Sequence, residues 1–295
     1  MTDWFDLMGA LVWEPFATFG FMRRALAGCL ALSISAAPMG VFLMLRRMSL
    51  TGDAMAHGIL PGAALGYLFA GLSLGAMTLG GIVAGLVVAV ASGLVARHTI
   101  LREDASLAAF YLLSLSVGVL LVSLKGSNVD LMHVLFGTVL ALNDDAVLLL
   151  GSTATLTLLG LAVLYRPLVL ECLDPGFLRA VSRWSPVAHH GFLVLLVINL
   201  VAAFHALGTL MAVGLMVLPA TAARFWARDI TRLLLVASFI GLSGAIAGLL
   251  LSYHADLPTG PVIVLCLGVA MLISMATGPF GLIRSHWPNR SHRQA

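Results

Sequence analysis

An acid and a histidine stand four residues apart at the start of a long apolar run, as Asp53 and His57. On an α-helix, a four-residue step places both side chains on one face, one turn apart. A carboxylate and an imidazole so placed can share one divalent cation or one proton, and ionisable groups at membrane depth are costly and usually functional. The pair therefore predicts a cation or proton site. The alternative is an aspartate that caps a helix at the membrane interface, with a hydrogen-bonded histidine one turn later.

The two residue types narrow the choice of ion. A carboxylate with an imidazole suits Zn(II), Mn(II) or Fe(II) better than Ca(II) or Mg(II), which prefer oxygen ligands. Two ligands are too few for a tight site, but a transport site must release its ion, and a second copy of the chain could supply a second pair. His205 and His254, at predicted outward turns, are further candidates for lining a pathway. The ion is expected to be cargo, with no permanently bound cofactor.

The composition is that of a membrane protein. Of 295 residues, 60% are hydrophobic and 10% are charged, with a mean hydropathy of +1.05, whereas soluble domains carry roughly 25% charged residues. The net charge of +3 is small, and the basic residues lie at the ends of apolar runs. This pattern indicates topology signals in a lipid bilayer and no nucleic-acid partner.

Apolar run lengths predict an all-α polytopic fold with about eight or nine transmembrane helices. They follow an N-terminal interfacial segment over 1–24, fill a transmembrane domain over 25–283, and precede a polar tail over 284–295. The stretch Val134–Leu142 is too short to cross and predicts a re-entrant or interfacial helix. The expected spans are 25–45, 53–74, 78–96, 105–123, 145–165, 189–204, 207–223, 232–253 and 259–276.

The distribution of arginines predicts on which side of the membrane each loop lies. Two expected spans separate each basic cluster from the next, so all clusters lie on one side, which the positive-inside rule assigns to the cytoplasm. One observation conflicts with this order: Arg23 and Arg24 precede the first span on the opposite side. Either the rule is locally outvoted, or one span is incomplete, and the 189–223 region, interrupted by Gly208 and Pro219, is then the candidate. The clusters lie at 46–47, 97–102, 166–183, 224–232 and 284–293.

Enzymatic motifs are absent from the sequence. There is no HExxH, and the single lysine, Lys125, is not preceded by the GxxxxG of a P-loop. The chain is therefore not expected to be an enzyme, and active transport would draw energy from a partner ATPase or an ion gradient.

Six ordered blocks are similar to the zinc/manganese/iron family of ATP-binding-cassette importer permeases, over nearly the whole chain. The departures are small: Gly58 stands where alanine is usual, and Gly176 where glutamate is usual. The blocks are LRRMSLTGDAMAHGILPGAALGYLFAG (45–71), REDASLAAFYLLSLSVGVLLVS (102–123), DLMHVLFGTVLALNDDA (130–146), ECLDPGFLRA (171–180), GTLMAVGLMVLPATAAR (208–224) and SYHADLPTGPVIVL (252–265).

This resemblance implies a fold like that of vitamin-B12-type importer permeases, in a bacterial plasma (inner) membrane. It implies a homodimer of permeases with two cytoplasmic ATPase subunits and an extracytoplasmic metal-binding protein. Asp53 and His57 match the acid and histidine that face the family's translocation path. The segment that engages the ATPase is matched by Glu171, Asp174, Pro175 and Phe177; from the residues alone, a solvated turn is the alternative.

The sequence thus predicts the permease subunit of an importer for zinc, manganese or iron. Two alternatives stay open at this stage. A permease for a metal chelate such as a siderophore would use the Asp53–His57 pair as a gate, and a proton-coupled secondary transporter would use it as a proton relay.

Overall fold

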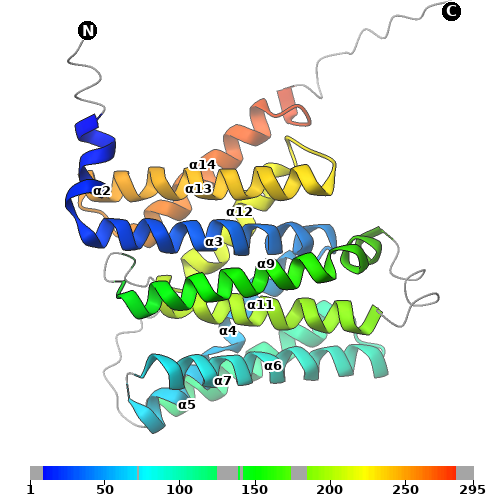
Figure 1. Cartoon of the computed structure of the whole chain (residues 1–295). Helices are drawn as coiled ribbons and strands as arrows, with labels where there is room; N and C mark the ends of the chain where they lie inside the picture. Colours follow the sequence, from blue (N-terminus) through cyan, green and yellow to red (C-terminus); the bar gives the residue numbers. More distant parts are fainter. Residues whose placement is uncertain (1–8, 72, 125–138, 140–141, 174–184, 284–295) are drawn as a thin grey trace, which may run out of the picture.

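The computed structural model describes residues 9–71, 73–124, 139, 142–173 and 185–283, and its regular elements there are helices (Figure 1). The all-α expectation is confirmed over these residues. The helices are η1 Gly9–Trp13, α2 Glu14–Thr18, α3 Gly20–Leu45, α4 Ser49–Gly58, α5 Leu60–Ala70, α6 Leu74–His98, α7 Glu103–Leu124, α9 Asp144–Leu173, α11 Ser185–Leu207, α12 Thr209–Ala223, α13 Ile230–Ala255 and α14 Thr259–Thr277.

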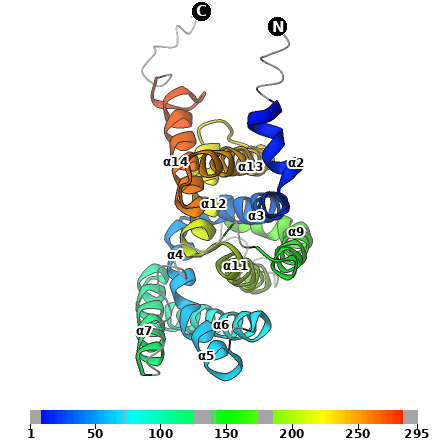
Figure 2. The same ribbon diagram turned by 90° about the vertical axis from the view of Figure 1, so that its left-hand side faces the viewer.

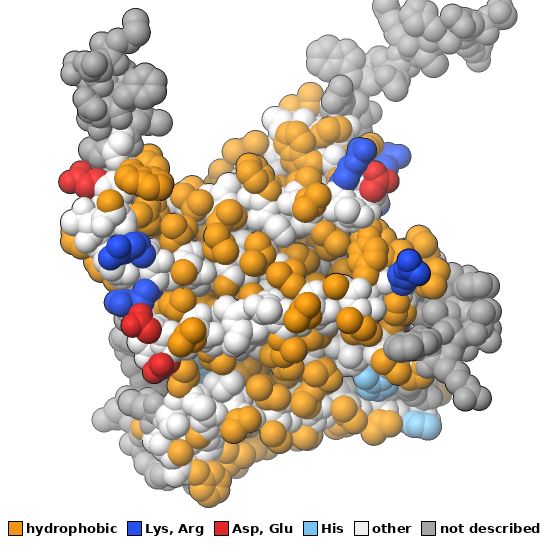
Figure 3. Space-filling view, in the orientation of Figure 1, with side chains coloured by type: hydrophobic (Ala, Val, Ile, Leu, Met, Phe, Trp, Pro, Cys, Tyr) orange, Lys and Arg blue, Asp and Glu red, His pale blue; other side chains and the backbone are white. Residues whose placement is uncertain are grey.

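Most of these helices are long and apolar enough to cross a bilayer. Within the described residues, 7 helices meet this criterion: α3, α6, α7, α9, α11, α13 and α14. The apolar helix α12 has 15 residues, and α4 and α5 have 10 and 11, so each is short for a hydrocarbon core of about 30 Å. On the face shown in Figure 3, a broad apolar region separates charged side chains at the two ends of the bundle, as a membrane-embedded protein requires.

The bundle is arranged around α3 and α11, whose side chains are mostly buried. Helix α3 packs against α9, α12 and α13, while α11 packs against α9 and α6. Helices α5, α6 and α7 form a group beyond α11 (Figures 1 and 2). The short α4 lies between these parts and contacts α7, α12, α11 and α6, so it is enclosed by the rest of the chain on several sides.

One expected span is broken in two. The sequence predicted a continuous helix over 53–74, but α4 ends at Gly58 and α5 runs from Leu60 to Ala70. Pro61 accounts for the break, because it has no N–H to donate to the carbonyl of His57 and its ring crowds that carbonyl. The discontinuity therefore falls directly after the Asp53–His57 pair.

Other boundaries also differ from the expectation. Helix α3 begins at Gly20, ahead of Ala25, and α9 continues through Pro167 to Leu173, beyond the predicted end at 165. The apolar residues after Pro167, such as the buried Leu168, explain the longer helix. In the 189–223 region, helix α11 is long enough to cross, and the short element is α12. Helix α12 begins directly after Gly208, whose φ is 85°.

Arg24, which is part of the exception to the positive-inside order, has an acidic partner. Arg24 lies at the start of α3, at the opposite end from Arg46, and its guanidinium Nη1 is 3.5 Å from Oδ1 of Asp144 at the start of α9. Both side chains are well exposed, so the pair contributes at most about 1 kcal/mol. It partly neutralises Arg24, which fits a local exception to the positive-inside rule, while the short α12 fits the alternative of an incomplete span.

Several predicted segments lie outside the described residues. These are most of the short helix expected at Val134–Leu142, the tail over 284–295 and residues 1–8. In the short stretch, the described Val139 and Leu142 are both buried. The remainder of the predicted interfacial segment is helical over η1 and α2 and exposes Trp13.

Candidate functional site

Helix α4 is buried on every side except one stripe. Thr51, Gly52, Ala54, Met55, Ala56 and Gly58 are buried. Leu50, Asp53 and His57 follow each other at helical spacing on the remaining face, with exposed fractions of 81% for Leu50 and 62% and 32% for the side chains of Asp53 and His57. The acid and the histidine therefore face away from the body of the chain, on a helix that is otherwise core.

The predicted pair is brought together as expected from the four-residue step. Nε2 of His57 lies 3.8 Å from Oδ1 of Asp53, too far for a direct hydrogen bond. Two bonds of about 2.1 Å to one ion, at a tetrahedral angle, would separate the donor atoms by about 3.4 Å. The observed spacing thus leaves room for one shared ion after a small adjustment.

The cap interpretation of Asp53 does not hold. Helix α4 begins at Ser49, and its N-cap is Met48, which makes no side-chain cap hydrogen bond. Asp53 lies in the middle of α4, so its carboxylate is available to a ligand and is not used by the helix start.

Helix α7 supports the break after His57. The hydroxyl of Ser114 donates a hydrogen bond of 2.8 Å to the carbonyl of Gly58, which is released because the N–H of Gly62 bonds Ile59 instead, at 3.1 Å. One turn before Ser114, the ring of Tyr111 lies 6.5 Å from that of His57, centroid to centroid. This face of α7 therefore positions the end of α4.

Removing this hydrogen bond should disturb the site specifically. Ser114→Ala leaves the Gly58 carbonyl without its donor, at a cost of about 1–3 kcal/mol, and we expect weaker metal-dependent uptake with normal protein levels. Ser116→Ala is the matched control, because its exposed hydroxyl bonds only its own helix, at the carbonyl of Leu112. Initial uptake rates per assembled complex measure the difference; equal rates in the two variants would contradict the positioning role.

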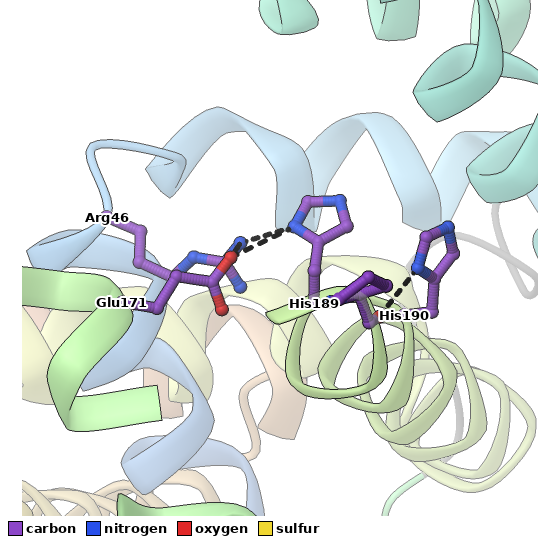
Figure 4. A network of polar contacts seen from close by, with 5 residues as sticks. Arg46, Glu171, His189 and His190 are labelled. Atoms are coloured by element: carbon purple, nitrogen blue, oxygen red, sulfur yellow. Dashed lines mark hydrogen bonds and ion pairs between the residues drawn. The ribbon is translucent and has the colours of Figure 1, made fainter. Parts of the chain in front are cut away.

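A second polar cluster lies at the end of the bundle where α3 and α9 end and α11 begins (Figure 4). Nη2 of Arg46 donates to Oε1 of Glu171 at 3.1 Å and to Nδ1 of His189 at 2.6 Å. Because a guanidinium only donates, Nδ1 accepts, and the proton of the neutral imidazole is on Nε2. The 3.5 Å approach of His189 Nδ1 to Glu171 Oε1 is then a contact between two acceptors. The three side chains are almost completely buried, and Arg46 also lies over the ring of Phe192, at 5.1 Å.

The remaining predicted site residues are scattered. His205 lies in the last turn of α11, where Nδ1 donates to the carbonyl of Val201 at 2.9 Å, and His254 is exposed near the end of α13. Within the described part of the chain, no group of three or more His, Cys, Asp and Glu side chains could hold a metal, so neither histidine joins the Asp53–His57 pair. Asp174, Pro175 and Phe177 lie outside the described residues, whereas Glu171 is buried in the last turn of α9.

Sequence reasoning missed the residues that support these sites. Ser114 and Tyr111 fall in an ordinary apolar span, and only their three-residue spacing hints at a shared face. Arg46 was counted only as a topology signal, and His189 was not among the predicted site residues. In each case the partner is remote in sequence, which a single sequence does not reveal.

Comparison with known proteins gives a consistent result. The profile of the ABC 3 transport family matches residues 18–278. The manganese import system permease protein ScaB of Streptococcus parasanguinis is 32% identical over 261 residues, covering 88% of this chain and 92% of the relative. The chelated iron transport system membrane protein YfeD of Yersinia pestis is 28% identical over 270 residues, covering 92% and 89%.

Two solved structures share the fold. PsaBC from Streptococcus pneumoniae, in complex with Fab, matches with a TM-score of 0.80 and 28% identity, covering 92% of this chain and 96% of that one. A metal-chelate type ABC transporter in an inward-facing conformation matches with a TM-score of 0.66 and 16% identity, covering 85% and 84%, which supports the fold alone. With a family profile matched over most of its length, the chain belongs to the ABC 3 transport family of ATP-binding-cassette permeases.

Proposed function

We propose that this permease carries a divalent transition metal, manganese, iron or zinc, into the bacterial cytoplasm. The observation that carries the proposal is the Asp53–His57 pair on the one open stripe of an otherwise buried apolar helix. Such a pair is costly within a membrane and is retained for function. Relatives named for manganese and chelated iron support the same class of cargo.

The stripe also supports a homodimer. Two ligands leave the coordination of a transition metal incomplete, and none of the other described His, Cys, Asp and Glu side chains completes it. A two-fold axis beside α4 would bring a second Asp53–His57 pair to the same ion and would cover Leu50. Water would fill the remaining positions and allow the ion to be released.

Energy and delivery would come from partners. Two cytoplasmic ATPase subunits would dock on the segment that includes Asp174, Pro175 and Phe177, between α9 and α11. An extracytoplasmic metal-binding protein would dock at the other end, where His205 and His254 would lie along the entry path. The chain itself would be a transport subunit and no enzyme.

Whole-cell metal content tests this function. Under metal limitation, a deletion strain should lose one of manganese, iron or zinc by mass spectrometry, and the cloned chain should restore it. Competition between the free ion and its siderophore or citrate chelate separates the cargo. Uptake of labelled ion that is blocked by excess unlabelled free ion, but not by the metal-loaded chelate, supports the proposal. Uptake that persists without the ATPase partner would instead favour a proton-coupled transporter, and unchanged metal content in the deletion strain would refute metal transport.

A further inference from the structure

The polar cluster of Arg46, Glu171 and His189 joins three helices at one point. Arg46 follows the end of α3, Glu171 lies in the last turn of α9, and His189 lies in the first turns of α11. One guanidinium nitrogen bonds both acceptors. Any displacement of the ends of α9 and α11 relative to α3 must therefore break or move these hydrogen bonds.

On one side, the cluster connects rigidly to the candidate metal site. After Arg46, the N–H of Arg47 bonds the carbonyl of Met44 at 3.1 Å, and the N–H of Met48 bonds that of Leu43 at 2.8 Å. Arg47 adopts a left-handed conformation, φ 59°, so the turn is a Schellman motif with arginine where glycine is usual. Helix α4 starts at once, at Ser49, and a shift of Arg46 thus passes through a hydrogen-bonded turn to the helix that carries Asp53.

The cluster also flanks the segment proposed to dock the ATPase. Residues 174–184 connect α9 to α11, so Glu171 precedes this segment and His189 follows it. A force applied there by a partner reaches the ends of α9 and α11 first, and Arg46 contacts both.

The chemistry of the cluster is poorly explained by stability alone. Burying an ion pair costs desolvation that its attraction does not always recover, and apolar side chains of similar size are often as stable. Nη1 of Arg46 is buried with no hydrogen-bond partner among the described residues. A buried donor in this state is a feature that needs an explanation, and a cluster that exchanges partners between two arrangements provides one.

We propose that Arg46, Glu171 and His189 form a joint that transmits movement of the ATPase-docking ends of α9 and α11 to α4. The three are positioning residues: Glu171 acts from inside the bundle, through Arg46, and not by contact with the ATPase. This inference rests on the proposed function for the identity of the partner, but its geometry lies wholly within the described residues.

A matched pair of variants isolates the joint. Glu171→Gln removes the charge of the buried carboxylate that pairs with Arg46. Asp144→Asn removes the charge of an exposed carboxylate at the other end of α9, which also pairs with an arginine, Arg24. The complex with its ATPase is reconstituted in nanodiscs, with Leu50→Cys in a background whose three cysteines are alanine. The rate of maleimide labelling at position 50 is measured with and without nucleotide trapped by vanadate. ATP hydrolysis and manganese uptake are measured on unlabelled complexes in proteoliposomes, which enclose a compartment for the transported ion.

In the parent and in Asp144→Asn, trapping should change the labelling rate at least 5-fold. In Glu171→Gln the change should disappear while vanadate trapping persists, and the ATP hydrolysed per manganese ion should rise at least 10-fold. An unchanged labelling response in Glu171→Gln would overturn the joint. If the parent responds to trapping but takes up no manganese, manganese is not the cargo, and the labelling result still decides the joint.

A second pair of variants covers the case in which Glu171→Gln does not assemble. His189→Asn retains an acceptor near the position of Nδ1, whereas His189→Phe keeps the bulk of the ring without one. Coupling retained in the first and lost in the second, at equal amounts of complex, supports the joint. Equal coupling in both would overturn it.

Discussion

Asp53→Asn should abolish metal uptake while leaving the complex assembled. The carboxamide keeps the shape of the side chain, but it loses the negative charge that draws a divalent cation into an apolar helix. Substitutions beside a metal ligand cost 10–100-fold, so loss of the ligand itself should reduce the initial rate by at least about 100-fold. Because 62% of the Asp53 side chain is exposed, its replacement should not reduce protein levels.

His57→Gln should have a similar effect on uptake through loss of the imidazole. His98→Gln is the matched control, since His98 is also a helix histidine, exposed at the end of α6, and it should transport normally. Initial rates of radioactive manganese uptake, divided by the amount of complex in the membrane, measure all three variants. Uptake by Asp53→Asn or His57→Gln within two-fold of the parent would refute the site, even if the protein is a metal permease.

Local spacing was sufficient for the part of the site that lies on one helix. The step from Asp53 to His57 placed both on one face because helical geometry fixes it, and the apolar runs identified all 7 long apolar helices of the described residues. Pro61 and Gly62 follow the pair closely in the sequence, but a continuous span was expected over 53–74. Two features together favour the break. Pro61 removes one helical hydrogen bond, and Ser114 of α7 donates a hydrogen bond to the carbonyl of Gly58.

Contacts between remote residues were beyond a single sequence. Arg46 and Glu171 are 125 positions apart, and Ser114 and Gly58 are 56 apart. The local sequence around one residue of each pair does not identify its partner. The family resemblance placed Glu171 in the segment that docks the ATPase. It did not reveal that the Glu171 side chain is buried, because this burial depends on how α3, α9 and α11 pack.

The seam between α5 and α6 depends on two glycines that face each other. A Cβ atom built on Gly62 would lie 1.9 Å from the carbonyl oxygen of Gly80, and one built on Gly80 would lie 2.1 Å from that of Gly62. Both obstacles are backbone atoms, which cannot rotate away as a side chain can. Small residues at a crossing are what allow membrane helices to approach so closely.

Gly80→Ala should therefore separate α5 from α6 and destabilise α5. This helix directly follows α4, which carries the candidate metal site. Overpacking typically costs 1–3 kcal/mol and occasionally more, and contact with a fixed backbone places this substitution at about 3 kcal/mol. Gly93→Ala in the same helix is the control, because nothing lies within 4 Å of its added Cβ and alanine favours the helix by about 1 kcal/mol. Thermal unfolding of the purified complex should show a lowered midpoint for Gly80→Ala and an unchanged or raised one for Gly93→Ala. Equal midpoints would mean that the helices relax apart at little cost, and the close approach would then not be what holds α5 beside α6.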